Sequence, residues 1–249
     1  MNLINIKVVA FSLFCTVAIL FSSCSGLKKG NEKRNAAKEI SVLIVGGGSS
    51  HDFDKWYKEV DIQTLTNEKI KASYIDDVSQ ILSLLPEADV LVLTNNQPIP
   101  DVATREAIFK FTAAGKGLVL AHAALWYNWA DWPEYNKTVV SGGSRGHDAY
   151  GSFEVNVVNK NHPVTKGVPA SFTLKDELYY FKEDPNGAGI EVLASANRAG
   201  STAVFPSVFV VKNPNARIVG LALGHDAESH DLKAYQSLLI NAVKWVSRK

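Results

Sequence analysis

Short apolar runs alternate with amphipathic segments along the first half of the chain. Aliphatic and β-branched runs at residues 40–45, 71–75, 89–93 and 117–121 predict strands that are buried on both faces. Between them, segments starting at Asp52 or Asp54, at 78–85 and at 101–114 predict helices, and Gly115 is the expected C-terminal cap of the third. Short strands separated by helices indicate an α/β fold with a mainly parallel sheet.

The regular pattern stops after Trp126. Residues 126–150 are rich in tryptophan and glycine, and so long a loop is usually functional. Further strands are expected at 153–158, 190–194, 207–211 and 218–223, the last two as a C-terminal β-hairpin. An amphipathic pattern at 232–246 predicts a closing helix. We expect residues 39–249 to form one domain.

Residues 1–24 have the pattern of a lipoprotein signal peptide. Lys7 precedes the apolar run 8–21, and small Ser23 precedes Cys24, the expected lipidation site and mature N-terminus. Residues 25–38 are polar and basic, which predicts a flexible tether. We therefore expect a membrane-anchored lipoprotein in the periplasm or at the cell surface, held to the membrane by lipid only. An uncleaved signal anchor is the alternative.

Composition excludes several kinds of chemistry. The 249 residues carry 26 basic and 25 acidic side chains, a net charge of +1, so we expect no nucleic acid partner. Cys15 and Cys24 both lie in the predicted signal peptide, which leaves no thiol nucleophile or disulfide in the mature chain. The triplet Gly46-Gly47-Gly48 lacks the spacing of a dinucleotide-binding motif, so no nucleotide cofactor is expected.

Histidines follow several of the predicted strands. Parallel sheets collect their sites at the carboxyl ends of strands, where His51 and His122 stand as candidate acid/base catalysts. Together with His225 and Asp226 they are also candidate ligands of a divalent metal such as zinc or manganese. The alternative for these histidines is a hydrogen bond to a strand-end carbonyl. His162 is interpreted as a turn residue and His230 as exposed.

A carboxylate pair and several aromatic residues complete the candidate site. Asp176 and Glu177 are candidate catalytic residues, with a solvated helix start as the alternative interpretation. The expected substrate-binding residues are Trp126, Trp129, His147, Tyr179 and Asn95.

Six short blocks, in order, resemble the trehalose-utilisation (ThuA-like) family. They are residues 45–53, 117–123, 141–147, 162–167, 176–179 and 223–226, followed by a terminal helix with Trp245. The resemblance implies a flavodoxin-like three-layer sandwich related to class I glutamine amidotransferases. Those enzymes carry a cysteine where this chain has Ala121-His122-Ala123, so thiol amidotransfer is not expected. The chain departs from the family in its hairpin, where only Arg217 matches the usual turn.

The resemblance also implies a role in disaccharide catabolism through 3-keto sugars. The first hypothesis is a hydrolase, lyase or isomerase that acts on a small-molecule glycoside or keto-sugar. The alternatives are a carbohydrate-binding lipoprotein without turnover and a scaffold for a sugar-oxidising partner. A homo-oligomer is compatible with each of them.

Overall fold

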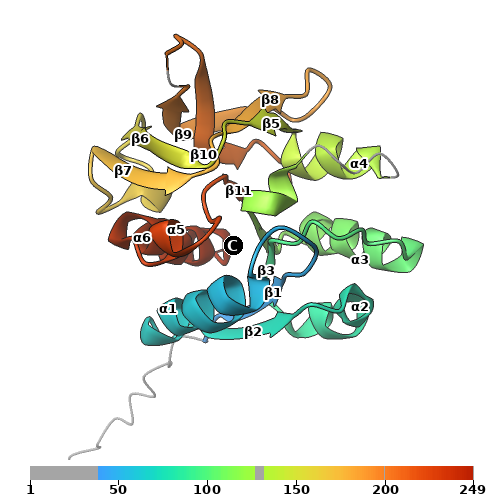
Figure 1. The fold of residues 1–249 in the computed structure, drawn as a ribbon. Helices are drawn as coiled ribbons and strands as arrows, with labels where there is room; N and C mark the ends of the chain where they lie inside the picture. Colours follow the sequence, from blue (N-terminus) through green and yellow to red (C-terminus); the bar gives the residue numbers. More distant parts are fainter. Residues whose placement is uncertain (1–38, 127–131, 199, 249) are drawn as a thin grey trace, which may run out of the picture. The chain divides into compact units, whose positions relative to one another are not determined.

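In the computed structural model, which describes residues 39–126, 132–198 and 200–248, a sheet of nine strands runs in the order β2-β1-β3-β4-β11-β10-β9-β6-β7 (Figure 1). One half is parallel, and its register pairs Val42 with both Ala72 and Val90. The parallel strands are β1 (Ser41–Val45), β2 (Lys71–Ile75), β3 (Val90–Leu93), β4 (Gly117–Ala121) and β11 (Ile218–Leu221).

The other half of the sheet is antiparallel. β10 pairs with β11 as the predicted hairpin, which is confirmed, and three further strands extend it. The hairpin strand is β10 (Val204–Val211), and the three further strands are β6 (Gly151–Val157), β7 (Ser171–Asp176) and β9 (Ile190–Asn197). A separate two-stranded sheet joins β5 (Gly142–His147) to β8 (Tyr179–Glu183). The sequence pattern predicts β6, β9, β10 and β11, whereas β5, β7 and β8 have no counterpart among the predicted strands.

Helices cover both faces of the parallel half. α1 and α6 lie on one side and α2 and α3 on the other (Figure 1). The helical segments are η1 (Asp54–Asp61), α1 (Ile62–Asn67), η2 (Val78–Gln80), α2 (Ile81–Leu84), η3 (Leu85–Glu87), α3 (Val102–Ala113), η4 (His122–Leu125), α4 (Pro133–Tyr135), η5 (Asn136–Val140), η6 (Pro163–Thr165), α5 (Ala227–His230) and α6 (Lys233–Val246). The predicted α/β architecture is therefore confirmed.

Successive side chains of each strand enter different cores. Val42 and Ile44 pack with Leu238 of α6 in one core, and Leu43 and Val45 pack with Ile108 of α3 in the other. This alternation is the period of two expected of a strand covered on both faces. Burying both faces fixes the register, and the carboxyl ends of β1, β4 and β11 meet at one edge of the sheet.

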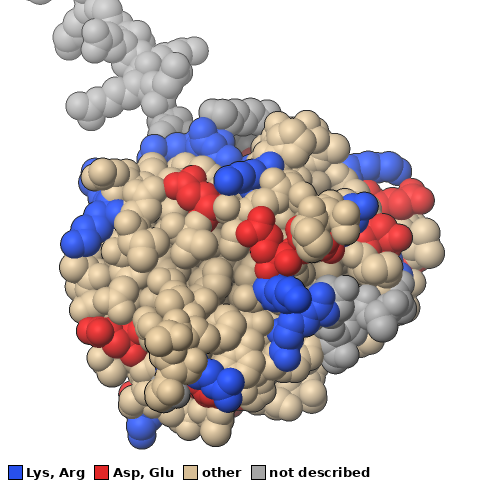
Figure 2. Space-filling view, turned by 90° about the horizontal axis from the view of Figure 1, so that it is seen from above, with Lys and Arg blue, Asp and Glu red and all other residues tan. Residues whose placement is uncertain are grey.

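The surface is mixed in charge. On the face shown in Figure 2, basic and acidic side chains are interspersed in small groups among uncharged residues. None of the described helices has both the length and the apolar composition needed to cross a bilayer.

Candidate metal centre

His122 begins η4 at the carboxyl end of β4 and is fully buried. Its φ of 41° lies in the left-handed region, where residues other than glycine are uncommon and where strain often marks a functional site. Its Nδ1 lies 2.8 Å from the carbonyl oxygen of Ala222. A carbonyl only accepts hydrogen bonds, so Nδ1 carries the proton and Nε2 keeps its lone pair. This Nε2 is buried and has no hydrogen-bond partner.

His51 is held in the same way by the turn after β1. The side chain of Asn96 accepts a hydrogen bond from the Ser49 backbone nitrogen and donates one to the Ser49 carbonyl, both at 2.8 Å. The His51 Nδ1 in turn lies 3.1 Å from that carbonyl. The Nε2 of His51 is therefore its unprotonated nitrogen, and it too is buried without a partner.

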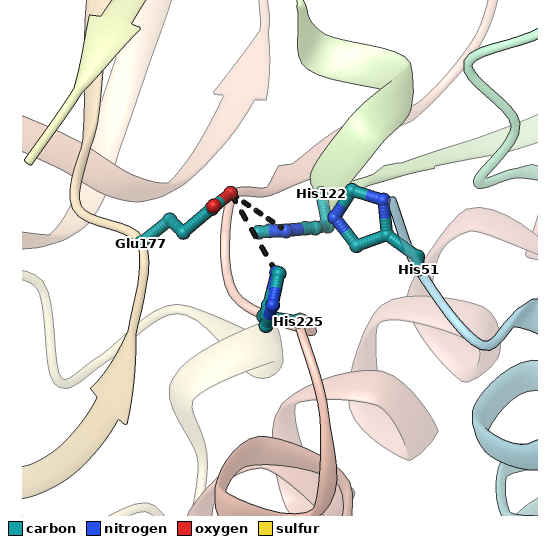
Figure 3. Close-up of side chains that lie close together, drawn as sticks. All are labelled: His51, His122, Glu177 and His225. Atoms are coloured by element: carbon teal, nitrogen blue, oxygen red, sulfur yellow. Dashed lines mark ion pairs between the residues drawn. The ribbon is translucent and has the colours of Figure 1, made fainter. Parts of the chain in front are cut away.

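His225 and Glu177 complete the cluster from two other connections. His225 follows β11, and Glu177 lies between β7 and β8. The Glu177 Oε2 is 3.6 Å from the His225 Nδ1 and 3.7 Å from the His122 Nε2, beyond ordinary hydrogen-bond distance. Figure 3 shows the carboxylate facing these two rings, with His51 beside His122.

Four side chains thus converge without forming hydrogen bonds to one another. One ligand atom from each of His51, His122, Glu177 and His225 lies within 4.8 Å of the others. Buried polar atoms are nearly always hydrogen-bonded, so three unpartnered imidazole nitrogens at one place need an explanation. Two imidazoles whose other nitrogen donates to a backbone carbonyl, a third imidazole and one carboxylate are a donor set typical of zinc and related divalent metals.

The electrostatics of the cluster agree with ligand chemistry. Burial lowers the pKa of His122 well below its usual range, and it also lowers that of His51. Burial acts to raise the pKa of Glu177, but the neighbouring His225, His122 and His147 outweigh it and lower that pKa to about 2. His51 and His122 as neutral imidazoles beside an ionised carboxylate are in the protonation states that bind a cation. The same carboxylate of Glu177 raises the pKa of His225, so a bound metal would displace a proton from that ring.

A buried network holds the turn that carries His225. The Gly224 carbonyl accepts hydrogen bonds from the Tyr57 hydroxyl at 2.8 Å and from the His230 Nε2 at 3.0 Å. The other ring nitrogen of His230 lies 2.7 Å from Asp61 Oδ1. Because both of its partners only accept, His230 donates from both nitrogens and carries a positive charge opposite Asp61.

Asp176 fixes the same turn from the other side. Its Oδ2 accepts hydrogen bonds from the backbone nitrogens of Gly224, at 2.8 Å, and His225, at 3.4 Å, and from the Ser229 hydroxyl. Asp176 is 1% exposed, and burial raises its pKa. This carboxylate therefore positions His225 and does not face the solvent-accessible part of the site.

A pocket of 290 Å³ opens above the cluster. Trp126 and Tyr179 form an aromatic wall, with ring centroids 5.6 Å apart, and Tyr179 also stacks on His122 at 4.6 Å. His147 stands over Glu177, with its Nδ1 3.7 Å from Oε1. The residues that line the pocket are Ser49, Ser50, His51, Asn96, Ala123, Trp126, His147, Glu177 and Tyr179.

Comparison with known proteins gives a consistent assignment. The family model described as "Trehalose utilisation" matches residues 41–246. The chain belongs to the ThuA family. Solved structures of ThuA-like proteins from Parabacteroides merdae and Bacteroides uniformis superpose with TM-scores of 0.73 and 0.71, at 24% and 26% identity. The matches cover 84% and 86% of this chain and 90% and 94% of those chains.

A more distant likeness concerns the fold alone. An α-L-fucosidase isoenzyme 2 from Paenibacillus thiaminolyticus matches with a TM-score of 0.54 at 10% identity, over 84% of this chain and 33% of that chain. Among curated proteins the comparison found no match. Membership of the ThuA family links the chain to trehalose utilisation in carbohydrate metabolism.

The structure brings most of the predicted site residues of this ThuA-family protein together. Trp126, His147 and Tyr179 line the pocket above His51, His122 and Glu177, which the sequence analysis had named as catalytic candidates. Glu177 follows a strand and not a helix start, so the solvated-helix interpretation was wrong. The predicted residues Trp129 and Cys24 lie outside the described residues.

Four sequence-based interpretations differ from the structure. Asp226 caps α5 by accepting a hydrogen bond from the Glu228 nitrogen and is not in the cluster, where Glu177 stands. Asp176, a predicted catalytic residue, is buried beneath the site and holds the turn of His225. Asn95 is fully buried and donates to the Gln97 carbonyl, whereas its neighbour Asn96 lines the pocket. His230, expected to be exposed, is fully buried because it pairs with Asp61.

The residues that support the ligands are not predicted by the sequence pattern. Tyr57, Asp61 and Ser229 act through hydrogen bonds between segments more than 50 residues apart. No local motif signals such a contact. One feature of the sequence could have indicated Asp61, because this charged residue interrupts the apolar face of a predicted helix.

Proposed function

We propose that this ThuA-family protein is a divalent-metal-dependent enzyme of carbohydrate catabolism that acts on a keto-sugar as a lyase or isomerase. The observation that carries the proposal is the set of three buried, unpartnered imidazole nitrogens facing the Glu177 carboxylate. Family membership supports the carbohydrate substrate class. His51, His122, Glu177 and His225 would hold the metal, which would polarise the oxygen of a ketone.

Residues of the pocket would bind the sugar ring and transfer a proton. Trp126 and Tyr179 offer an aromatic wall against which the apolar face of a sugar ring would pack. His147 donates from Nδ1 to the Asp148 carbonyl at 2.7 Å, so the lone pair of the neutral ring is on Nε2. That nitrogen would take the proton from the carbon next to the ketone, the step shared by isomerisation and elimination.

We also propose that the mature protein is a secreted lipoprotein. The predicted signal peptide and Cys24 support this proposal. The mass of the N-terminal peptide tests it: a diacylated or triacylated Cys24 is expected, and an N-terminus at Met1 would refute it.

The metal proposal is tested by metal analysis of untagged protein from Ser25 onward, purified without chelator. Inductively coupled plasma mass spectrometry should find about one equivalent of a divalent metal in the wild type and none in His122→Ala. His162→Ala is the matched control, because His162 lies outside the cluster against Trp245. Equal metal content in all three samples, or none in any of them even after incubation with zinc or manganese, would contradict the proposal.

If the protein binds a metal, the next experiment tests the proposed reaction. The metal-loaded protein is incubated with 3-keto disaccharides, and the products are followed by mass spectrometry and by exchange of the proton next to the ketone in deuterated water. We expect exchange that requires both metal and His147. Sugar binding without exchange or product would favour the non-catalytic carbohydrate-binding alternative, which the aromatic wall also fits.

A further inference from the structure

A second pocket lies far from the metal centre, between η6 and the C-terminal end of α6. Its volume is 540 Å³, and it is lined by Lys160, Asn161, Pro163, Lys166, Asn241, Lys244, Trp245 and Arg248. Four of these residues are cations, and none of the lining residues is acidic. The pocket is therefore basic, although residues 39–249 contain 20 basic against 24 acidic side chains.

The walls of this basic pocket are tied together. The Asn241 amide donates to the carbonyl oxygens of Val164 and Lys166, at 3.1 and 2.8 Å, and so joins α6 to the η6 turn. Arg217 donates to the Trp245 carbonyl at 3.0 Å, which satisfies part of the helix C-terminus. Lys244 is partly neutralised by Glu68 at the rim, so Lys160, Lys166 and Arg248 supply most of the positive charge.

The basic pocket sits at the end of the sheet opposite to the metal centre. The backbone of Val246 packs on Gly117, the first residue of β4, whereas His122 follows the last. Backbone hydrogen bonds link Gly117 to Asp89 and Asp89 to Ser41, so the folded chain begins at this same end. An attachment N-terminal to Ser41 therefore joins the domain at the end of the sheet where the basic pocket lies.

We infer that the basic pocket binds the phosphate groups of anionic lipids and orients the domain with its metal centre away from the membrane. The predicted tether, residues 25–38, reaches roughly 50 Å when fully extended. A tether of this length lets this end of the domain reach the headgroups. Lysine and arginine side chains beside an anionic bilayer each add to the attraction, and a partly exposed tryptophan suits the interfacial region.

The inference depends on the proposed lipoprotein anchor only because the anchor would place the domain near a membrane. It is independent of the proposed reaction.

Vesicle sedimentation tests the inference. Unlipidated protein from Ser25 onward is sedimented with phosphatidylcholine vesicles that contain or lack phosphatidylglycerol. The tether is present in every sample, so its own charge cancels from the comparison. Lys160→Glu/Lys166→Glu tests the basic pocket, and Lys110→Glu/Lys137→Glu, on α3 and η5, makes the same change of net charge elsewhere.

We expect wild type to prefer the anionic vesicles and the pocket variant to bind them about tenfold more weakly, with the control close to wild type. Thermal unfolding checks that both variants are folded, and Lys160→Gln/Lys166→Gln gives a milder version. Equal losses in the pocket and control variants would refute the inference, as would equal binding to both kinds of vesicle. Calorimetric binding of inorganic phosphate, lost in the pocket variant while vesicle binding is unchanged, would replace it with a site for a free anion.

Discussion

The Nδ1 of His122 lies 2.8 Å from the Ala222 carbonyl oxygen, and this one hydrogen bond decides which nitrogen faces the cluster. β4 and β11 are neighbours in the sheet, so the carbonyl is presented by the strand beside the histidine. The ring cannot rotate without breaking that bond inside a fully buried site. His122 is thereby fixed as a neutral imidazole whose lone pair points at Glu177.

Replacing Glu177 by glutamine should weaken divalent-metal binding at least tenfold. The change keeps the size of the side chain and removes its charge, which is the only negative charge of the four clustered ligands. Isothermal titration with zinc and manganese measures the effect. Glu154→Gln, on the exposed part of β6, is the control and should bind as wild type. Unchanged affinity in Glu177→Gln would remove this residue from the ligand set.

Tyr57→Phe should weaken metal binding although Tyr57 touches no ligand atom. The variant removes one of the two donors to the Gly224 carbonyl, so the turn that presents His225 loosens. Tyr135→Phe removes a comparable buried hydrogen bond, to the Ala124 carbonyl, in the other core. Both should lose about 1 kcal/mol of unfolding free energy in urea. A similar loss of metal affinity in both variants would indicate general loosening and no specific role for Tyr57.

The His230–Asp61 pair should stabilise the fold more at acidic than at alkaline pH. Burial acts to lower the pKa of His230, but the charge and hydrogen bond of Asp61 outweigh it and leave the pKa raised. The contribution is therefore complete below the ordinary histidine pKa of 6.5 and is lost as the pH rises from there through the folded-state pKa. Urea unfolding of wild type and His230→Gln measures it, as a stability difference that shrinks between about pH 6 and about pH 8. A difference that grows over this range would contradict the assignment of charge.

Trp126→Ala should impair substrate binding more than turnover. Trp126 lines the pocket beside Tyr179 but offers no group for proton transfer or metal binding. We expect KM for an accepted keto-sugar to rise about tenfold with kcat changed much less, because stacking acts on bound substrate and transition state alike. Metal content should stay at the wild-type level. A fall in kcat with unchanged KM would assign Trp126 a different role.

The sequence predicted the parallel half of the fold well because its strands are buried on both faces and read as continuous apolar runs. The runs at 40–45 and 117–121 needed no long-range information, and they placed His51 and His122 at one sheet edge. β5 and β7 were missed because Gly142–His147 and Ser171–Asp176 are polar or glycine-rich. Their pairing is set by neighbouring strands and not by their own composition.

The choice of Asp226 over Glu177 as a ligand has a similar physical origin. Asp226 stands next to His225 in the sequence, and adjacency suggested that it orients the ring. In the folded chain its carboxylate instead satisfies the start of α5, at the Glu228 nitrogen. Glu177 lies 48 residues before His225, and only the antiparallel half of the sheet brings it within reach.

The joined parallel and antiparallel halves of the sheet have a consequence for the order of folding. His51, His122 and His225 belong to the parallel half, whereas Glu177 comes from a connection beyond four antiparallel strands. The three imidazoles can therefore assemble before the carboxylate arrives. A bound cation would then cross-link the parallel half of the sheet to the connection that carries Glu177. Loss of the cation would first release the segment between β7 and β8. Refolding followed by stopped flow should accordingly show metal capture as a late phase, after most of the helical signal has recovered.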